Sequence, residues 1–397
     1  MVLTAPHHRG HDFLGCILII VGVTMGSGLV SMILEEKLAK LSKLVEELSL
    51  KGLIIVSESM NRWILGKSLS SFVSVKPDGV RVYVPVLEYT RALDHLSGIR
   101  SIEVIAYQRY PLDVPENFNI FKGGLEDLIR REVSVKGAIG CDLSYLGKRM
   151  LDILMGRCVD ISEDLWAIRA SKSQSELEAI SKAAEIASRA YLDVVEGIHE
   201  GISERELAGD IDRALRRRGS EGYAFPTIVA SGPNASYPHA EPSDRVILEG
   251  DSVVIDMGAM YMGYVSDMTR MVMGKKIDQE VRRALDAVED ALDRALERIS
   301  PGVKASEIDE AARSTLERRG YGKYYIHSTG HGVGVEVHEQ PLLSRTSQST
   351  LEKGHVITVE PGIYIPGKLG VRLEELVLVS EKGAVILTKA PRVTWIQ

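Results

Sequence analysis

Five acidic or imidazole side chains interrupt otherwise apolar stretches in the second half of this chain: Asp256, Asp267, His331, Glu360 and Glu374. Charged groups inside apolar strands cost free energy unless they are paired or bound to a cation. Two divalent cations would neutralise this much buried negative charge. Carboxylates with one imidazole suit Mn, Co, Zn or Fe, so the residue types predict a metal site.

The first two of these residues lie in a stretch that is typical of a β-hairpin. Residues 253–273 (VVIDMGAMYMGYVSDMTRMVM) contain two β-rich runs separated by glycines. Such a hairpin could bring Asp256 and Asp267 together. Taken alone, the pair fits equally well with one surface aspartate and one aspartate paired with Arg270.

Three histidines, His327, His331 and His338, lie within twelve residues of a glycine-rich stretch, HSTGHGVGVEVHE. Glycines let the backbone approach a ligand closely. Histidine is the commonest metal ligand and the usual proton shuttle near neutral pH. A single histidine is more often structural, but three between glycines favour a functional site.

The elements that must position these residues are expected to form the second of two domains, since 397 residues exceed one compact core. Residues 32–165 alternate short apolar runs with helical patterns, which predicts a smaller α/β domain without a nucleotide-binding glycine motif. The polar stretch 169–178 opens a long helix. We therefore place the boundary near Trp166, with the larger domain at 166–397.

The larger domain contains an internal repeat. Residues 201–219 and 302–320 match at a constant offset of 101 residues, so that Leu207 corresponds to Ile308. Two copies predict a duplicated helix–helix–strand unit about a pseudo-twofold axis. A cleft between two related halves is a natural place for a site.

Composition and charge are typical of a globular protein that does not bind nucleic acid. Hydrophobic residues make up 45% of the chain and charged residues 26%, as in ordinary soluble globular proteins. The net charge of -7 argues against a nucleic-acid partner. Cys16, Cys141 and Cys158 show no CxxC spacing, so we expect buried thiols in a reducing, cytoplasmic compartment.

The N-terminal region carries an uncharged apolar stretch, 13–32, about as long as a membrane span. Its glycines argue against a stable span, and the lack of a small-residue cleavage site argues against a signal peptide. We therefore expect residues 1–31 to be an extension outside the fold, with the working protein starting near Met25 or Met32. A membrane anchor or a signal peptide is the alternative.

Five motifs in sequence order resemble those of the creatinase/aminopeptidase P/prolidase group of metallopeptidases (M24-type). They are FPTIVASGPNASYPHA, VVIDMGAMYMGYVSDMTR, HSTGHGVGVEVHE, VEPGIY and GVRLEE. The resemblance covers nearly all of 170–397 and extends more weakly to 32–165. It implies an α+β fold, with a duplicated pita-bread catalytic domain preceded by a smaller α/β creatinase-like N-terminal domain.

The resemblance also implies roles for individual residues. Asp256 would bind one metal ion, Asp267 and Glu374 would bridge both, and His331 and Glu360 would bind the other. His239 and His338 match two substrate-facing histidines, while His327 and Arg372 match supporting positions near the cleft. We expect a homodimer, as is usual in the family.

The expected reaction removes the N-terminal residue that precedes a proline, as Xaa-Pro dipeptidases and aminopeptidase P do. Two divalent ions can generate a hydroxide nucleophile from a bridging water, and Glu360 is the expected proton shuttle to the leaving nitrogen. One difference from the related dipeptidases leaves open whether the substrate is a dipeptide or a longer peptide. Related archaeal-type dipeptidases carry an arginine where this chain has Leu342 and Leu343, and the nearest base is Arg345.

Three other functions stay open at this stage. A methionine aminopeptidase would share the ligands, but the N-terminal domain argues against it. A non-catalytic peptide-binding protein on the same fold is disfavoured by the intact ligand set. A metal-dependent lyase on the same scaffold is the third alternative.

Overall fold

The computed structural model describes residues 27–69, 72–99, 101–144 and 146–396. The first helix, α1 (Ser27–Glu47), begins five residues before the expected start at Met32. Most of the apolar stretch 13–32 lies outside the described residues, so the start site, the anchor and the cytoplasmic location stay predictions. Within the described part, no helix is long and apolar enough to cross a membrane.

The first half of the chain is built on a seven-stranded mixed sheet with the order β5-β4-β3-β2-β1-β6-β7. Its strands are β1 (Leu53–Ile55), β2 (Phe72–Lys76), β3 (Gly79–Pro85), β4 (Ile102–Gln108), β5 (Ile120–Lys122), β6 (Gly140–Cys141) and β7 (Val159–Asp160). The helices are α1, α2 (Glu58–Leu65), η1 (Val86–Glu88), α3 (Tyr89–His95), α4 (Leu125–Val133), α5 (Lys148–Leu154) and α6 (Ser162–Ala170). Three of the short apolar runs that the sequence shows in 32–165, namely 53–56, 80–86 and 102–107, form β1, β3 and β4, which confirms the expected strands.

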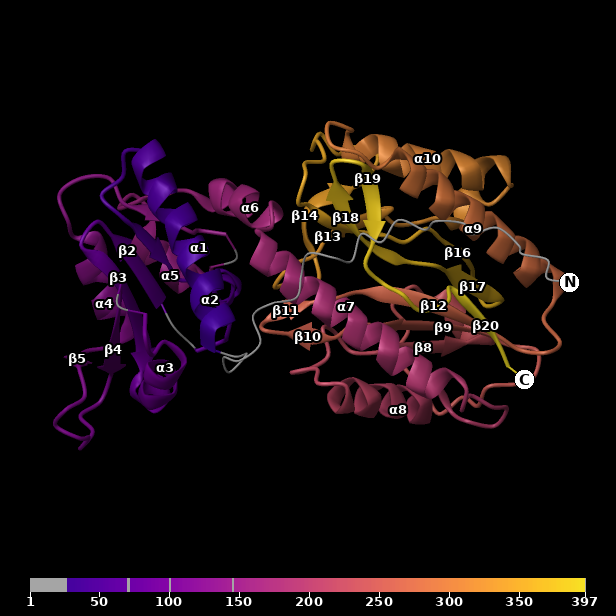
Figure 1. Ribbon diagram of the computed structural model, residues 1–397, viewed down its shortest axis with the longest axis horizontal. Helices are drawn as coiled ribbons and strands as arrows, with labels where there is room; N and C mark the ends of the chain where they lie inside the picture. The colour runs from indigo at the N-terminus through magenta and orange to yellow at the C-terminus, as the bar shows by residue number, and fades with distance from the viewer. Residues whose placement is uncertain (1–26, 70–71, 100, 145, 397) are drawn as a thin grey trace, which may run out of the picture.

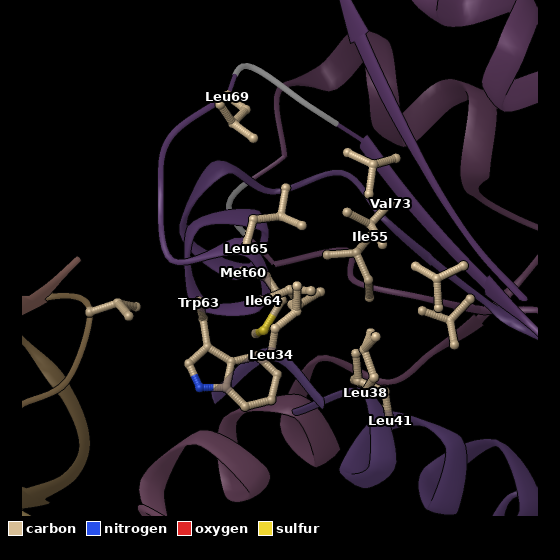
Figure 2. Close-up of a cluster of buried hydrophobic side chains, with 14 of the residues drawn as sticks. Leu34, Leu38, Leu41, Ile55, Met60, Trp63, Ile64, Leu65, Leu69 and Val73 are labelled. Carbon is tan, nitrogen blue, oxygen red and sulfur yellow. The ribbon is translucent and has the colours of Figure 1, made fainter. Parts of the chain in front are cut away.

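An apolar stripe attaches α1 to this sheet. Leu34, Leu38 and Leu41, spaced for one helical face, are almost fully buried. Figure 2 shows them beside Trp63 of α2 and Ile55 of β1. From the sequence, Leu48 continues the same helical spacing and would extend the stripe, but it follows the end of the helix and is 40% exposed, so that expectation is wrong.

The expectation of free thiols is also wrong. Cys141 on β6 and Cys158, just before β7, form a disulfide with their Cα atoms 5.8 Å apart. The parallel pairing of β6 with β7 brings the two residues together, although 17 positions separate them in the sequence. Cys16 lies outside the described residues.

The second half of the chain holds two larger sheets, with the orders β20-β12-β9-β8 and β14-β13-β15-β18-β19, and two short hairpins, β10-β11 and β16-β17. Its helices are α7 (Gln174–Val195), α8 (Glu204–Arg217), η2 (Gly232–Ser236), α9 (Gln279–Arg298), α10 (Ala305–Arg318) and η3 (Gly322–Tyr324). Its strands are β8 (Ile228–Ser231), β9 (Ser252–Met257), β10 (Met260–Tyr261), β11 (Tyr264–Val265), β12 (Met268–Met273), β13 (Gly330–Gly332), β14 (Glu339–Leu343), β15 (Val356–Val359), β16 (Gly362–Ile365), β17 (Leu369–Arg372), β18 (Glu375–Ser380), β19 (Gly383–Ile386) and β20 (Val393–Trp395).

The internal repeat is confirmed by the helices. The bounds of α8 and α10 differ by 101 residues at both ends, and each helix packs against the long helix that precedes it. In Figure 1, α7 and α8 cover one side of the strands and α9 and α10 cover the other. The strands between these helix pairs carry the predicted metal ligands. The expected boundary near Trp166 falls within α6 and stays a prediction.

Candidate metal centre

The first two predicted ligands come from a confirmed hairpin of β9 and β12, which pair antiparallel with Thr269 opposite Asp256. Side chains of a strand alternate between its two faces. On β9, Val253, Ile255 and Met257 pack towards α7 and α8, so Asp256 points to the opposite face. Asp267 and Thr269 share a face by the same period. The hairpin therefore aims both carboxylates at the strands that follow α10 in the chain, on or beside which the other three predicted ligands lie.

His331 on β13 presents one ring nitrogen to these carboxylates. Its Nδ1 lies 3.1 Å from the carbonyl oxygen of Gly332, and a carbonyl can only accept, so Nδ1 carries the proton. Nε2 is then free to bind a cation, in the arrangement that metal-binding histidines usually have. Nε2 lies 3.3 Å from Glu360 Oε1 and 3.8 Å from Asp267 Oδ2.

Three of the five predicted ligands converge on one point. One ligand atom each of Asp267, His331 and Glu374 lies within 4.8 Å of the others, and all three residues are buried. Thr269 donates a 2.8 Å hydrogen bond to Glu374 Oε2 and orients that carboxylate. Glu360 joins this group through His331.

Asp256 is held differently from the other four. Its Oδ2 accepts a 2.6 Å bond from Arg372, whereas its buried Oδ1 has no hydrogen-bond partner. A buried carboxylate oxygen without a donor is costly, and a cation would satisfy it. This oxygen without a partner lies beside the converging ligands. It is the observation which indicates that these residues are suited to bind divalent metal ions.

The carboxylates are too crowded to ionise together without cations. Burial raises the pKa of Asp267 well above its usual range, and the charges of Glu374 and Asp256 raise it further. Burial and the neighbouring carboxylates act on the pKa of Glu374 in the same way. Burial also opposes ionisation of Glu360, but its hydrogen bond with His331 lowers its pKa to about 2. Divalent cations would replace protons in this cluster.

Addition of Mn²⁺ to the metal-free protein is expected to raise Tm more at about pH 7.5 than at about pH 5, because metal and protons compete for the carboxylates. The folded-state pKa values of Asp267 and Glu374 lie above the ordinary 3.8 and 4.5. The folded protein therefore binds more protons, and its stability falls as pH rises above about 4 towards the raised pKa values. At a metal concentration 100-fold above Kd, binding should add about 2.7 kcal/mol. Differential scanning calorimetry of the chelated protein with and without Mn²⁺ measures the shift.

The matched control for this titration is the Asp267→Asn/Glu374→Gln variant, which removes both titrating groups. It should show little shift with Mn²⁺ at either pH. An equal Mn²⁺ shift at both pH values in the original protein would contradict the assignment of these carboxylates as ligands.

A cavity of about 1120 Å³ opens in front of the cluster. All nine predicted site residues line it: His239, Asp256, Asp267, His327, His331, His338, Glu360, Arg372 and Glu374. The rings of His338 and His331 meet edge to face with centroids 4.4 Å apart. His239 follows η2, and both it and His338 are exposed to the cavity. Their placement fits a substrate-facing role.

Arg372 and His327 are linked by a tyrosine that the sequence reasoning did not single out. Tyr364 on β16 accepts a 2.9 Å bond from Arg372 Nη1, and its hydroxyl lies 3.1 Å from His327 Nε2. Arg372 also donates to Thr269 and Asp256. The signal was available, since Tyr364 ends the motif VEPGIY.

A second missed feature is a buried ionic cluster behind His338. Glu339 accepts from Arg169 at 2.5 Å and from Lys172 at 3.2 Å. All three side chains are at most 2% exposed. The cluster ties the segment around α6 to the loop that carries His338.

One buried acid of α8 fixes the loop that carries His239. The Glu204 carboxylate accepts hydrogen bonds from Ser231, Asn234 and Ser243, and the three residues span the segment on both sides of His239. Glu204 itself is fully buried. It therefore anchors the loop on both sides of His239.

The duplicated fold and this buried donor set define a metal-dependent hydrolase. The chain belongs to metallopeptidase family M24, whose sequence profile matches residues 178–381. The Creatinase/Prolidase N-terminal domain profile matches residues 37–171. The α+β architecture expected from the sequence is confirmed by these matches and by the fold.

Several relatives match almost the whole chain. It is 36% identical over 362 residues to the Xaa-Pro dipeptidase of Pyrococcus furiosus, covering 90% of this chain and 99% of the relative. The solved structure of the prolidase from Pyrococcus furiosus superposes with a TM-score of 0.76 at 34% identity, covering 88% of this chain and 99% of that one. The X-Pro aminopeptidase from Thermotoga maritima gives a TM-score of 0.80 at 30% identity, covering 91% and 99%.

Proposed function

We propose that this protein hydrolyses the peptide bond between an N-terminal residue and a following proline, with two divalent metal ions in its site. The observation that carries the proposal is the convergence of Asp267, His331 and Glu374 on a cavity large enough for a peptide. Glu360 and Asp256 complete the proposed set of five ligands. The names of the relatives, Xaa-Pro dipeptidase and X-Pro aminopeptidase, support proline specificity.

Two bound divalent ions would supply Lewis acidity and an activated water near neutral pH. The chain's own groups then divide the remaining work. His239 and His338 face the cavity and can donate hydrogen bonds to the carbonyl oxygen as it gains negative charge. Arg372 holds Asp256 in place, and Thr269 holds Glu374.

Glu360 is the proposed proton carrier. An amide nitrogen that belongs to proline has no N–H, so it must gain a proton before it can leave as an amine. Glu360 lies within 3.3 Å of His331 and lines the cavity, where it can take a proton from the attacking water and deliver it to this nitrogen. The apolar residues Phe225, Pro226 and Val337, which also line the cavity, offer walls for the proline ring.

The proposed function is tested by incubating the purified protein, loaded with Mn²⁺ or Co²⁺, with Ala-Pro, Ala-Pro-Ala and Met-Ala-Ser. We expect hydrolysis of at least one proline peptide and slower or no hydrolysis of Met-Ala-Ser. Faster cleavage of Met-Ala-Ser would favour an aminopeptidase of other specificity. If the metal sites are filled and no peptide is cleaved, the peptidase function is wrong.

The assembly is a separate proposal. We infer a homodimer from the family resemblance alone, and light scattering of the metal-loaded protein tests it. A mass close to one chain of 43.7 kDa would contradict a dimer.

A further inference from the structure

The lining of the cavity is strongly acidic outside the metal centre. Glu163, Glu241 and Glu352 are exposed along its wall, and none of them forms an ion pair with a described basic side chain. Among the described lining residues, Arg372 is the one arginine or lysine. A substrate carboxylate that entered this space would therefore meet more carboxylate side chains than arginine or lysine side chains.

Arg372 is already committed to other partners. Its Nε donates to Thr269 at 3.0 Å, Nη1 donates to the Pro238 carbonyl at 3.0 Å and to the Tyr364 hydroxyl at 2.9 Å, and Nη2 donates to Asp256 at 2.6 Å. A guanidinium has five N–H groups, so four of them are used. The remaining N–H, on Nη2, can make only one bond, so a bidentate pair with another carboxylate would mean releasing Asp256, which is one of the proposed metal ligands.

Free dipeptides and longer peptides differ in charge at one defined place. In Xaa-Pro, three bonds separate the scissile carbonyl carbon from the terminal carboxylate carbon, which places them roughly 3–4 Å apart. The carboxylate must therefore enter the cavity together with the scissile bond. In a longer peptide the same position holds a neutral amide. Desolvating a carboxylate without a nearby cation is unfavourable, whereas a neutral amide carries no such penalty for charge.

We propose that this cavity selects peptides of three or more residues with proline second over free Xaa-Pro dipeptides. The inference rests on the proposed function and concerns the same site. The cavity volume of about 1120 Å³ exceeds the ~300–1,000 Å³ of typical small-molecule pockets, so it leaves room for residues beyond the proline.

One wall of the cavity shows where a cation is lacking. On β14, Gln340 and Leu342 are exposed and line the cavity, whereas Leu343 is fully buried in the core. Arg345, the next basic residue, pairs at 2.7 Å with exposed Glu317 and does not line the cavity. An arginine at position 342 would place a positive charge on this wall.

The test compares Ala-Pro, Ala-Pro-Ala and Ala-Pro-amide with the metal-loaded protein. The amide has the size of the dipeptide without its negative charge, so it separates charge from length. We expect kcat/KM for the amide and for Ala-Pro-Ala to exceed that for Ala-Pro by about tenfold or more, mainly through KM, because uniform binding acts on KM. Equal or faster cleavage of Ala-Pro than of its amide overturns this inference and leaves the proposed function standing. Cleavage of none of the three overturns both.

A pair of variants tests the placement of the charge. Leu342→Arg should raise kcat/KM for Ala-Pro about fivefold or more without a similar gain for the amide, by adding an ion pair inside the cavity. Leu342→Gln, polar but neutral, should leave the acid-to-amide ratio as it is. A Leu342→Arg effect that is equal on acid and amide would overturn the role of charge. The comparison of substrates in the unmodified protein decides the question if either variant fails to fold.

Discussion

His331→Ala is expected to lose about one of the two proposed metal ions and at least ~10³-fold in kcat/KM. The reason is that its Nε2 is aimed at Asp267 and Glu360, and alanine offers no ligand atom in its place. Loss of a group that only orients a ligand typically costs ~10–100-fold, and loss of a ligand itself should exceed that. Metal content by atomic emission and steady-state kinetics on Ala-Pro-Ala measure the two effects.

Asp267→Asn is the matched comparison, because Asp267 is proposed to bridge both ions whereas His331 binds one. We expect Asp267→Asn to reduce metal content below one ion per chain, and His331→Ala to leave about one. Circular dichroism should confirm that both variants are folded. Retained activity in His331→Ala, or equal metal loss in both variants, would refute the proposed division of ligands.

Local periodicity explains why the convergence of the candidate ligands was predictable from the sequence. Asp256 and Asp267 interrupt apolar strands, and the two-residue period of a strand determines the face to which each side chain points. The observed pairing of Thr269 with Asp256 follows from that hairpin. The repeat was predictable for a similar reason, because the helical spacing in α8 recurs in α10 at a constant offset.

Contacts between distant segments were not predictable in this way. The bond between Arg169 and Glu339 joins residues 170 positions apart, and a single sequence contains no periodic signal for such a pair. The disulfide was missed because a reducing cellular compartment was inferred from the number and spacing of the cysteines. The pairing of β6 with β7 decides which cysteines meet, and the cysteine count contains no information about it. Tyr364 was missed because its role depends on the hydrogen bonds of Arg372 and His327 and not on its own strand.

The buried ionic cluster provides the second large expected effect. Glu339→Gln should lower the free energy of unfolding by about 3–5 kcal/mol, because removal of one partner leaves buried charges uncompensated. The side chains of Arg169 and Lys172 are 0% and 1% exposed. Glutamine keeps an oxygen that can accept from the backbone N–H groups of Val335 and Glu336, as Glu339 Oε1 does. The substitution therefore removes mainly the charge. Urea unfolding monitored by fluorescence measures the change.

Glu336→Gln is the control, since Glu336 also pairs with Arg169, at 3.0 Å, but its side chain is 31% exposed. Solvent-exposed ion pairs contribute about 0–1 kcal/mol, so this variant should lose at most about 1 kcal/mol. Equal losses in Glu336→Gln and Glu339→Gln would show that burial of the charge does not decide the effect.

The effect of Glu339→Gln should also depend on pH. Burial opposes ionisation of Glu339, but the charges of Arg169 and Lys172 hold its pKa below the ordinary 4.5. A carboxyl with a lowered folded-state pKa contributes stability above its unfolded pKa and loses it as the pH falls through the folded value. The difference between the original protein and the variant should therefore be full near neutral pH and shrink below about pH 4.5. A difference that stays constant down to pH values where Glu339 is protonated would mean that the lost stability comes from packing and not from charge.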